Sequence, residues 1–308
     1  TVLQTALEVG LIYGLVALAL FISFSILNIA DLSTDGCFTL GCAVGAMLTI
    51  AGHPILALFA AMAAGMLSGY VTAFLQTRLG VESILAGIIS NTGLYTINLA
   101  VMGFSSNVSI TGVDTVFSLF KGLVGGQWSR LILLALIAAV IVLVLIRFFG
   151  TSLGLSIRAT GDSLDMVSAS SINPKATITI GLCLANALTA LSGCLIGEYN
   201  KFCDINLGTG MVTIALASLI IGEVFAGRRG SVGKRVVCVV LGSIVYRFII
   251  ALALRLNISA EYFKLVSAVI VAVAIAAPNM KDYVHLAKIK SNARKLRALS
   301  GKGDETDA

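Results

Sequence analysis

Two polar segments interrupt the apolar stretches of the sequence and carry side chains suited to contacting a polar solute. The first, residues 28–36, reads NIADLSTDG and contains Asp31 and Asp35. The second, residues 204–210, reads DINLGTG, and each segment is followed by an apolar stretch that is short for a full membrane span. Irregular backbone at membrane depth survives only where it lines a cavity or is buried in protein. A pair of such breaks in corresponding halves of a chain indicates a translocation path; two ordinary loops between short helices are the alternative.

One arginine, Arg247, falls in the middle of an apolar stretch near the C-terminal end. Charged side chains inside a membrane are costly and are functional candidates by default. The possible carboxylate partners of this arginine are Asp31, Asp35, Asp204 and Glu223. We expect a structural ion pair that holds the broken helices together, with direct contact to a ligand as the alternative.

A longer polar segment, residues 150–174, separates two further apolar stretches. Its apolar residues Leu164, Val167 and Ile172 are spaced among aspartates and serines, which fits a short amphipathic helix outside the bilayer. A helix of this kind between two membrane spans presents a docking surface to a cytosolic partner.

The composition places the chain among the polytopic helical membrane proteins. Of its 308 residues, 58% are hydrophobic and 12% are charged, whereas a typical soluble domain is about 25% charged. The net charge of +6 comes from basic residues that gather in loops and in the tail, so it does not indicate nucleic-acid binding. The predicted fold is all-α, with about 8–10 transmembrane helices and two broken segments.

The predicted apolar segments follow one another along most of the chain. They cover about residues 3–27, 37–50, 55–76, 84–102, 130–149, 176–197, 211–225, 236–254 and 262–277. Residues 1–280 thus form one transmembrane domain, and residues 281–308 form a basic cytosolic tail. Pairs of glycines four residues apart suit close helix packing: Gly10/Gly14, Gly41/Gly45, Gly65/Gly69 and Gly193/Gly197.

The distribution of Lys and Arg predicts the orientation of the chain. Four basic segments fall on one side by alternation: Arg78, residues 147–175, residues 227–235 and the tail. The positive-inside bias makes that side cytosolic. Residues 103–127 and 198–210 then lie outside, together with the N-terminus. A re-entrant bend at residues 28–36 would instead place the N-terminus on the cytosolic side.

No catalytic or metal-binding pattern stands out. The six cysteines show no C-x-x-C spacing, and His53 and His285 have no second ligand nearby in the sequence, so no metal site is expected. Residues 227–235 superficially resemble a phosphate-binding loop. They lack its first glycine, however, and have Arg235 where Ser or Thr must hold Mg²⁺. We therefore expect no cofactor on this chain, and energy must come from a partner or from an ion gradient.

The polar segments resemble those of a known family. The sequence NIADLSTDGCFTLG, residues 28–41, resembles the region after the first span in permeases of the branched-chain amino acid and ribose type. Residues 158–174 are similar to the cytosolic coupling loop of those permeases, and residues 85–98 resemble the branch paired with tryptophan- and tyrosine-type binding lipoproteins. The resemblance covers nearly the whole chain up to about residue 277. The branched-chain members carry Ala-His-Gly where this chain has DLSTD, so their substrate is not assumed.

The resemblance implies a permease subunit of a binding-protein-dependent ABC importer with a type II importer fold, in the inner membrane of a bacterium. Its substrate would be an amino acid or similar small solute, with tryptophan or tyrosine favoured. Two copies would form the pathway as a homodimer. Two separate ATPase subunits, which hold ATP and Mg²⁺, would dock on the coupling loop, and an extracytoplasmic binding lipoprotein would deliver the ligand.

Two groups of site residues follow from this reading. The substrate-path residues would be Asn28, Asp31, Thr34, Asp35, Asn91, Tyr95, Asn206 and Thr209. The ATPase-coupling residues would be Arg158, Gly161, Asp162, Ser163, Asp165, Met166 and Ser168. The alternative function is an ion-coupled secondary transporter, which would use Asp31 and Asp35 and need no ATPase.

Overall fold

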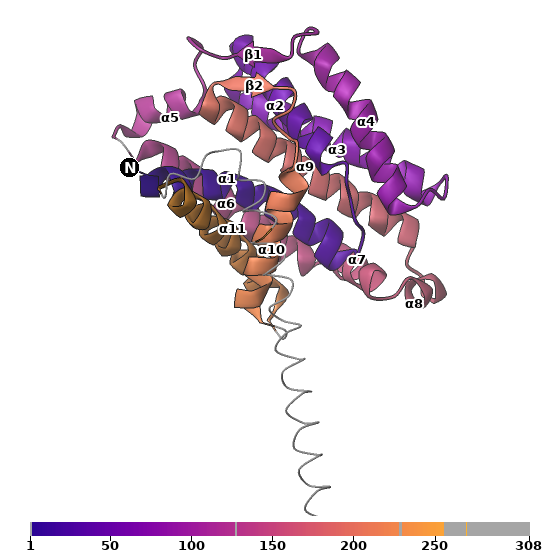
Figure 1. Ribbon diagram of the computed structural model, residues 1–308. Coiled ribbons are helices and arrows are strands. Elements are labelled where there is room, and N and C mark those ends of the chain that lie inside the picture. Colours follow the sequence, from indigo (N-terminus) through magenta and orange to yellow (C-terminus); the bar gives the residue numbers. More distant parts are fainter. Residues whose placement is uncertain (1, 127, 228–229, 256–268, 270–308) are drawn as a thin grey trace, which may run out of the picture.

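The structure is a computed structural model that describes residues 2–126, 128–227, 230–255 and 269 (Figure 1). The predicted span at residues 262–277, apart from residue 269, and the predicted tail at residues 281–308 lie outside the described residues.

The described chain is almost entirely helical. The helices are α1 (Val2–Leu20), its π-helical continuation η1 (Phe21–Ile26), α2 (Thr34–Ile50), α3 (Pro54–Thr77), α4 (Ser83–Val101), α5 (Val116–Val124), α6 (Ser129–Phe149), α7 (Ser152–Asp162), α8 (Leu164–Ala169), α9 (Pro174–Asn200), α10 (Met211–Ala226) and α11 (Val232–Arg255). Two short strands, β1 (Asn107–Ser109) and β2 (Phe202–Asp204), pair antiparallel.

Six helical segments in the described residues are long and apolar enough to cross a membrane: α1 with η1, α3, α4, α6, α9 and α11. The helices α2 and α10 are apolar but shorter, with 17 and 16 residues. A helix satisfies its backbone hydrogen bonds within itself, which is why such apolar segments adopt this form in lipid. The predicted all-α polytopic membrane fold is confirmed.

The central helix is α9, which packs against α1, α2 and α3. Glycines permit this packing, because a side chain at their positions would collide with a neighbouring backbone. Gly41 lies against the Ala190 backbone, and Gly193 lies against the Phe38 carbonyl. The predicted glycine pairs of α2, α3 and α9 all lie at these helix contacts, and Gly10 and Gly14 of α1 face α11.

The molecule has two ends that differ in structure. At one end β1 and β2 pair, which joins the loop before α5 to the loop after α9, and the start of α1 lies near α5 at this same end (Figure 1). We call it the hairpin end. At the opposite end lie α7 and α8, and we call it the α8 end. The two loops that the sequence places on one side of the membrane are therefore in direct contact.

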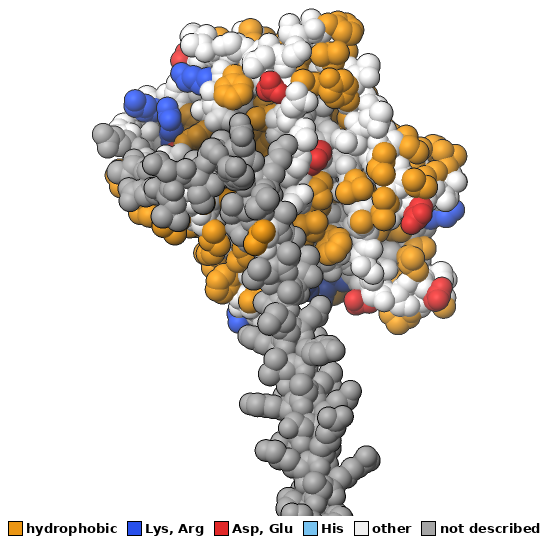
Figure 2. Space-filling view, in the orientation of Figure 1, with side chains coloured by type: hydrophobic (Ala, Val, Ile, Leu, Met, Phe, Trp, Pro, Cys, Tyr) orange, Lys and Arg blue, Asp and Glu red, His pale blue; other side chains and the backbone are white. Residues whose placement is uncertain are grey.

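The faces of α3, α4 and α6 that point away from α9 are apolar and exposed. Figure 2 shows hydrophobic side chains spread over the side that carries α3 and α4, with charged side chains mainly toward the ends. Phe59 and Leu67 on α3 are 69% and 68% exposed. A soluble protein would bury such side chains, so this surface is suited to contact with lipid.

Candidate solute pathway and coupling surface

The first break connects η1 to α2, and its backbone is organised by Asp31. After η1, Asn28 adopts a left-handed conformation with a φ of 56°. The Asp31 carboxylate is 3% exposed and accepts hydrogen bonds from the backbone N–H and the hydroxyl of Ser33, at 2.9 and 2.6 Å. It also accepts one from the Asn186 amide on α9, at 2.9 Å, and the Thr34 hydroxyl donates to its backbone carbonyl. The bend is thus fixed to the central helix.

Asp35, in the first turn of α2, caps the start of α10. Its two carboxylate oxygens accept hydrogen bonds from the backbone N–H groups of Gly210 and Val212, each at 2.9 Å. The first N–H groups of a helix have no partner inside that helix, and a negative charge there is favoured by the helix dipole. The hydroxyl of Thr39 accepts from the N–H of Gly208 at 3.1 Å. The two breaks, far apart in the sequence, therefore meet.

The second break is irregular but fully hydrogen-bonded along its N–H groups. Every backbone N–H from Ile205 to Val212 has an acceptor. The acceptors belong to Ser106, Asp204, Thr39, Asn206, Asp35 and Gly208. An unsatisfied N–H is expensive in lipid, so this complete pairing allows non-helical backbone to enter the membrane.

Contacts along α9, which is long enough to cross the membrane, place both breaks near the middle of this helix, a level that we call half depth. Asn186 lies about 18 Å from Pro174 and about 21 Å from Asn200 along the helix axis. Its amide holds Asp31, and its carbonyl accepts from the Cys37 thiol in the first turn of α2. The start of α2 is therefore level with the middle of α9.

From this level α2 and α10 run in opposite directions. Near the far end of α2, the Thr49 hydroxyl donates to Glu198, close to the hairpin end of α9. Near the far end of α10, Glu223 contacts Ser25 of η1 and Arg235 at the start of α11. Each of the two short helices thus runs from the middle of α9 toward one end of the molecule, and their N-termini face each other at that level.

The predicted substrate-path residues divide by exposure. Thr34 and Asp31 are buried, and Asp35 and Asn91 are half-buried. The exposed members are Asn28, Asn206, Thr209 and Tyr95. Thr209 lies between Gly208 and Gly210, which bond to α2, so it exposes a polar group at half depth. Lipid offers no hydrogen bonds, and this face therefore requires water or another protein surface.

The helix α4 brings two asparagines to the first break. The Asn98 side chain donates to the Gly36 carbonyl at 3.0 Å, and the Asn91 side chain lies directly against Gly36. Tyr95, by contrast, is 51% exposed on the outer part of α4. The structure therefore brings Asn91 to the break but leaves Tyr95 outside this group.

Arg247 makes a contact that differs from the predicted ion pair. Its guanidinium carbon lies 3.8 Å from the centroid of the Tyr13 ring on α1, and Tyr13 stacks on Phe38 of α2. Among the residues that the structure describes, Arg247 forms no ion pair with any of the four predicted carboxylates. Asp31 and Asp35 accept hydrogen bonds within the two breaks, and Asp204 accepts one from the Asn206 N–H. Glu223 forms its ion pair with Arg235. A cation–π contact takes the place of the predicted pair.

The ion pair that does hold a broken helix involves Arg235. Its guanidinium lies 2.6 Å from Glu223 of α10, donates to the Ser25 hydroxyl of η1, and stands 5.1 Å from the centroid of the Phe21 ring. The Ser25 hydroxyl also contacts Glu223. Three elements, η1, α10 and α11, are joined here at the α8 end of the molecule. The sequence placed Arg235 in a loop and did not indicate this role.

The predicted amphipathic segment forms two short helices instead of one. Thr151 caps α7, Ser163 caps α8, and Ser163 also ends α7 in an extended conformation. Only Val167 of α8 is buried, at 1% exposure, whereas Leu164 and Met166 are 54% and 59% exposed. Of the apolar residues that suggested an amphipathic helix, Val167 packs inward and Leu164 is exposed at the start of α8.

The predicted coupling residues occupy different positions on α7 and α8. Asp162, Asp165, Met166 and Ser168 are exposed, and Arg158 and Ser163 are half-buried. Gly161 packs directly against the end of η1, where any side chain would collide with the Ile26 carbonyl. The Thr160 hydroxyl pairs with the Thr177 hydroxyl of α9 at 2.8 Å. The end of α7 is thus in direct contact with the end of η1, the element that leads into the first break.

A further carboxylate secures the hairpin end. Glu198, 1% exposed, accepts from the Thr49 hydroxyl of α2 at 3.0 Å and from the Val116 N–H of α5 at 2.8 Å. In the sequence it appeared only as the first residue of a polar loop. Among the described ranges no group of three or more His, Cys, Asp or Glu side chains is arranged to hold a metal ion.

These features define the class of the protein. It is a multi-pass helical membrane protein in which two half-helices meet inside the membrane, an arrangement typical of transporters. The model of the family described as the permease component of branched-chain amino acid transport systems matches residues 2–275. The chain belongs to this family, so it is a transport subunit and not an enzyme. For a bacterial permease this means the cell membrane, and the family implies an ABC transporter with ATPase and binding-protein partners.

Two relatives extend this comparison. The chain is 31% identical over 294 residues to a tyrosine transport system permease protein of Clostridioides difficile (strain R20291), and this alignment covers 95% of each chain. It is also 31% identical over 284 residues to the uncharacterized protein RP368 of Rickettsia prowazekii (strain Madrid E), which covers 91% of this chain and 99% of that one. No solved structure matches. The predicted resemblance to this permease family is confirmed.

Proposed function

We propose that the chain is the permease subunit of a binding-protein-dependent ABC importer, in which docking of an ATPase on α8 drives the two half-helices. The supporting observation is the mechanical connection between these parts. Gly161 of α7 packs directly on the last residue of η1, and η1 leads into the first break. A rigid displacement of α7 and α8 therefore shifts the segment that holds the start of α2.

The surface of α8 is suited to a protein partner. Leu164 and Met166 are apolar, exposed and flanked by the exposed carboxylates Asp162 and Asp165. An exposed apolar patch with a polar rim is typical of an interaction site. With the α8 end cytosolic, as the positive-inside bias indicates, the partner is a cytosolic ATPase that holds ATP and Mg²⁺.

The pathway itself requires a second copy of the chain. Asn206 and Thr209 expose polar side chains at half depth, beside the N-termini of α2 and α10. Two permeases that face each other through this surface, as a homodimer, would enclose these groups around a polar path. Because Asp31 and Asp35 already occupy the starts of α2 and α10, the groups offered to a passing amino acid would be the exposed polar side chains of Asn206 and Thr209.

The favoured substrate is an aromatic amino acid such as tyrosine or tryptophan. This part of the proposal rests on the relative named as a tyrosine transport permease and on the coverage of that match. Ion-coupled transport through Asp31 and Asp35 is disfavoured, because their side-chain oxygens already accept hydrogen bonds from Ser33, Asn186, Gly210 and Val212.

The double variant Leu164→Asp/Met166→Asp tests this function. We expect it to lower the amount of ATPase that copurifies with the tagged permease by about tenfold or more, because two apolar contacts at the centre of an interface are lost. Its melting temperature in detergent should be unchanged, since both side chains are exposed. Copurification is measured by mass spectrometry, and substrate uptake is measured in proteoliposomes with internal ATP.

The matched control is Phe104→Asp, because Phe104 is apolar and 74% exposed but follows α4 near the hairpin end. It should leave ATPase copurification intact. Uptake that proceeds without any ATPase and follows an imposed ion gradient would refute the importer and favour the secondary transporter.

A further inference from the structure

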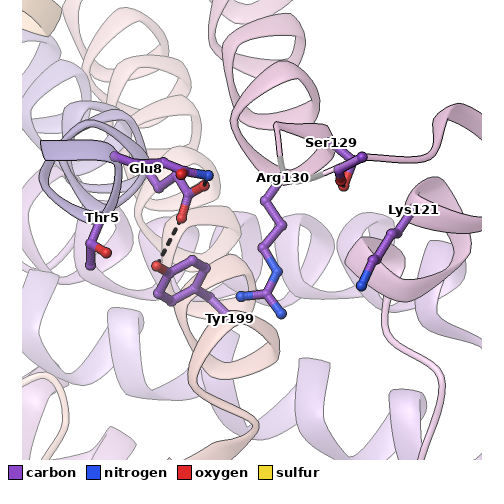
Figure 3. Close-up of a pocket in the computed structure, with 8 residues that line it drawn as sticks. Thr5, Glu8, Lys121, Ser129, Arg130 and Tyr199 are labelled. Carbon is purple, nitrogen blue, oxygen red and sulfur yellow. Dashed lines mark hydrogen bonds between the residues drawn. The ribbon is translucent and has the colours of Figure 1, made fainter. Parts of the chain in front are cut away.

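A polar pocket of about 380 Å³ lies at the hairpin end, between the start of α1, α5, the start of α6 and the end of α9 (Figure 3). It is separate from both breaks and from the coupling surface. Its charged side chains are Glu8, Lys121 and Arg130, and Tyr199 forms part of its wall. A volume of this size lies within the range of small-molecule sites.

Glu8 is a buried carboxylate whose position is fixed. It is 3% exposed, and its two oxygens accept hydrogen bonds from the Gln4 amide at 3.0 Å and from the Tyr199 hydroxyl at 2.9 Å. A carboxylate can accept about four hydrogen bonds, so capacity for another donor remains. Because an isolated buried carboxylate is costly, a cation in the pocket would stabilise it.

Two cations reach the pocket from the side opposite Glu8. Figure 3 shows the side chains of Arg130 and Lys121 extending from α6 and α5 toward the space beside Tyr199. The Arg130 guanidinium carbon lies 5.9 Å from the centroid of the Tyr199 ring. No carboxylate among the described residues forms an ion pair with Arg130 or Lys121. The pocket thus separates one negative group from two positive groups.

An aromatic surface connects the two charged sides. The Tyr199 ring packs edge-to-face on Phe117 of α5, with 6.0 Å between the ring centroids. Phe117 is itself buried, so the Tyr199 ring is held in place between Glu8 and Arg130. A flat apolar wall between opposite charges matches a molecule that carries both charges and an aromatic side chain.

We propose that this pocket binds a free aromatic α-amino acid as a zwitterion. The ligand ammonium would donate to Glu8, and the ligand carboxylate would bind the forked guanidinium of Arg130, with Lys121 adding a second positive charge. The ligand ring would lie against Tyr199. The placement of this capture site on the outer face of the membrane rests on the orientation in the proposed function, whereas the binding chemistry does not.

Direct binding to the purified full chain in nanodiscs tests the pocket. The probes are L-tyrosine, tyramine, which lacks the carboxylate, and 3-(4-hydroxyphenyl)propionate, which lacks the ammonium. Isothermal titration should show L-tyrosine binding at least about tenfold more tightly than either analogue, because each analogue loses one charge-assisted contact.

Variants assign the two contacts to residues. Arg130→Gln should weaken L-tyrosine binding by about tenfold or more and leave tyramine binding unchanged. Glu8→Gln should remove the preference for L-tyrosine over the propionate. The control Lys201→Gln removes an exposed positive charge at the same end and should have no effect. Melting temperatures show whether each variant is folded, and Tyr199→Phe provides a milder change of the same pocket.

The outcomes separate this proposal from the proposed function. If Arg130→Gln binds L-tyrosine as tightly as the wild type, or if tyramine binds equally well, the pocket proposal is wrong, even where ATP-driven uptake persists. A second result would also overturn the proposal: the wild type binds no L-tyrosine, and the folded Arg130→Gln variant differs only in no longer binding the extracytoplasmic binding protein. The pocket would then be a docking site for that protein. The effect of the α8 variants on ATPase copurification tests the proposed importer function and has no bearing on the pocket.

Discussion

Asp35→Ala is expected to abolish transport and to destabilise the membrane domain. The substitution removes both acceptors of the Gly210 and Val212 N–H groups at the start of α10. These donors lie at half depth, where lipid cannot replace the lost bonds. Leaving a buried donor unsatisfied costs about 1–3 kcal/mol for each hydrogen bond, and for these partly buried donors we expect a loss toward the lower end of that range. The melting temperature of the purified protein and substrate uptake in proteoliposomes are the measurements.

Two further variants show whether the effect of Asp35→Ala comes from the lost helix cap or from the loss of any carboxylate. Asp35→Asn keeps one acceptor oxygen in nearly the same shape and should retain part of the stability that the alanine variant loses. The control Asp114→Ala removes an exposed carboxylate whose one hydrogen bond among the described residues comes from the Ser118 hydroxyl, and it should behave as the wild type. An Asp35→Ala protein that melts and transports normally would show that the start of α10 does not depend on this cap.

The sequence predicted the breaks because local composition determines them. Polar residues in DLSTD and DINLGTG interrupt the apolar sequence, and the short apolar stretches that follow them predict short helices. The start of α10 agrees with this prediction, whereas α2 begins three residues earlier than predicted, at Thr34, so that Asp35 lies in its first turn. Membrane spans are similarly local, since about 20 apolar residues suffice to identify one. These features need no knowledge of which segments touch.

Partners across the fold could not be predicted in this way. Asp35 appeared as a possible path residue, whereas its bonds to Gly210 and Val212 depend on how α2 and α10 meet. Arg247 appeared as the arginine most in need of a carboxylate. It lies instead on the Tyr13 ring, while Arg235, about 18 Å away along α11, holds Glu223. Which charged side chains form ion pairs is therefore determined by helix packing and not by their spacing in the sequence.

The pocket at the hairpin end shows the same limit. Glu8 and Tyr199 are bonded at 2.9 Å but stand almost two hundred residues apart in the sequence. Arg130 and Lys121 resemble ordinary charges that flank a membrane span. Nothing in their spacing indicates that α1, α5, α6 and α9 bring them to one pocket. The glycine pairs, in contrast, were visible in the sequence, although their partners were not.

Gly41→Val is expected to prevent formation of the folded protein. At Gly41 the backbone of α2 touches that of α9, and even a single added carbon would overlap the Ala190 carbonyl. A rigid neighbouring backbone cannot move aside as a flexible side chain can. Separating the two helices would also displace Asn186 from Asp31, which breaks the bond that holds the first bend. We expect a cost above the roughly 1–3 kcal/mol that is typical of overpacking.

The control for this variant is Gly93→Ala, because Gly93 lies within α4 and a carbon added there meets no atom within 4 Å. It should fold as the wild type, and its gain in helix propensity, up to about 1 kcal/mol, can only help. Fluorescence-detected gel filtration of both variants in mild detergent measures the folded yield. A monodisperse Gly41→Val peak with the wild-type melting temperature would mean that α2 and α9 are not in backbone contact, and the half-depth position of both breaks would then have to be abandoned.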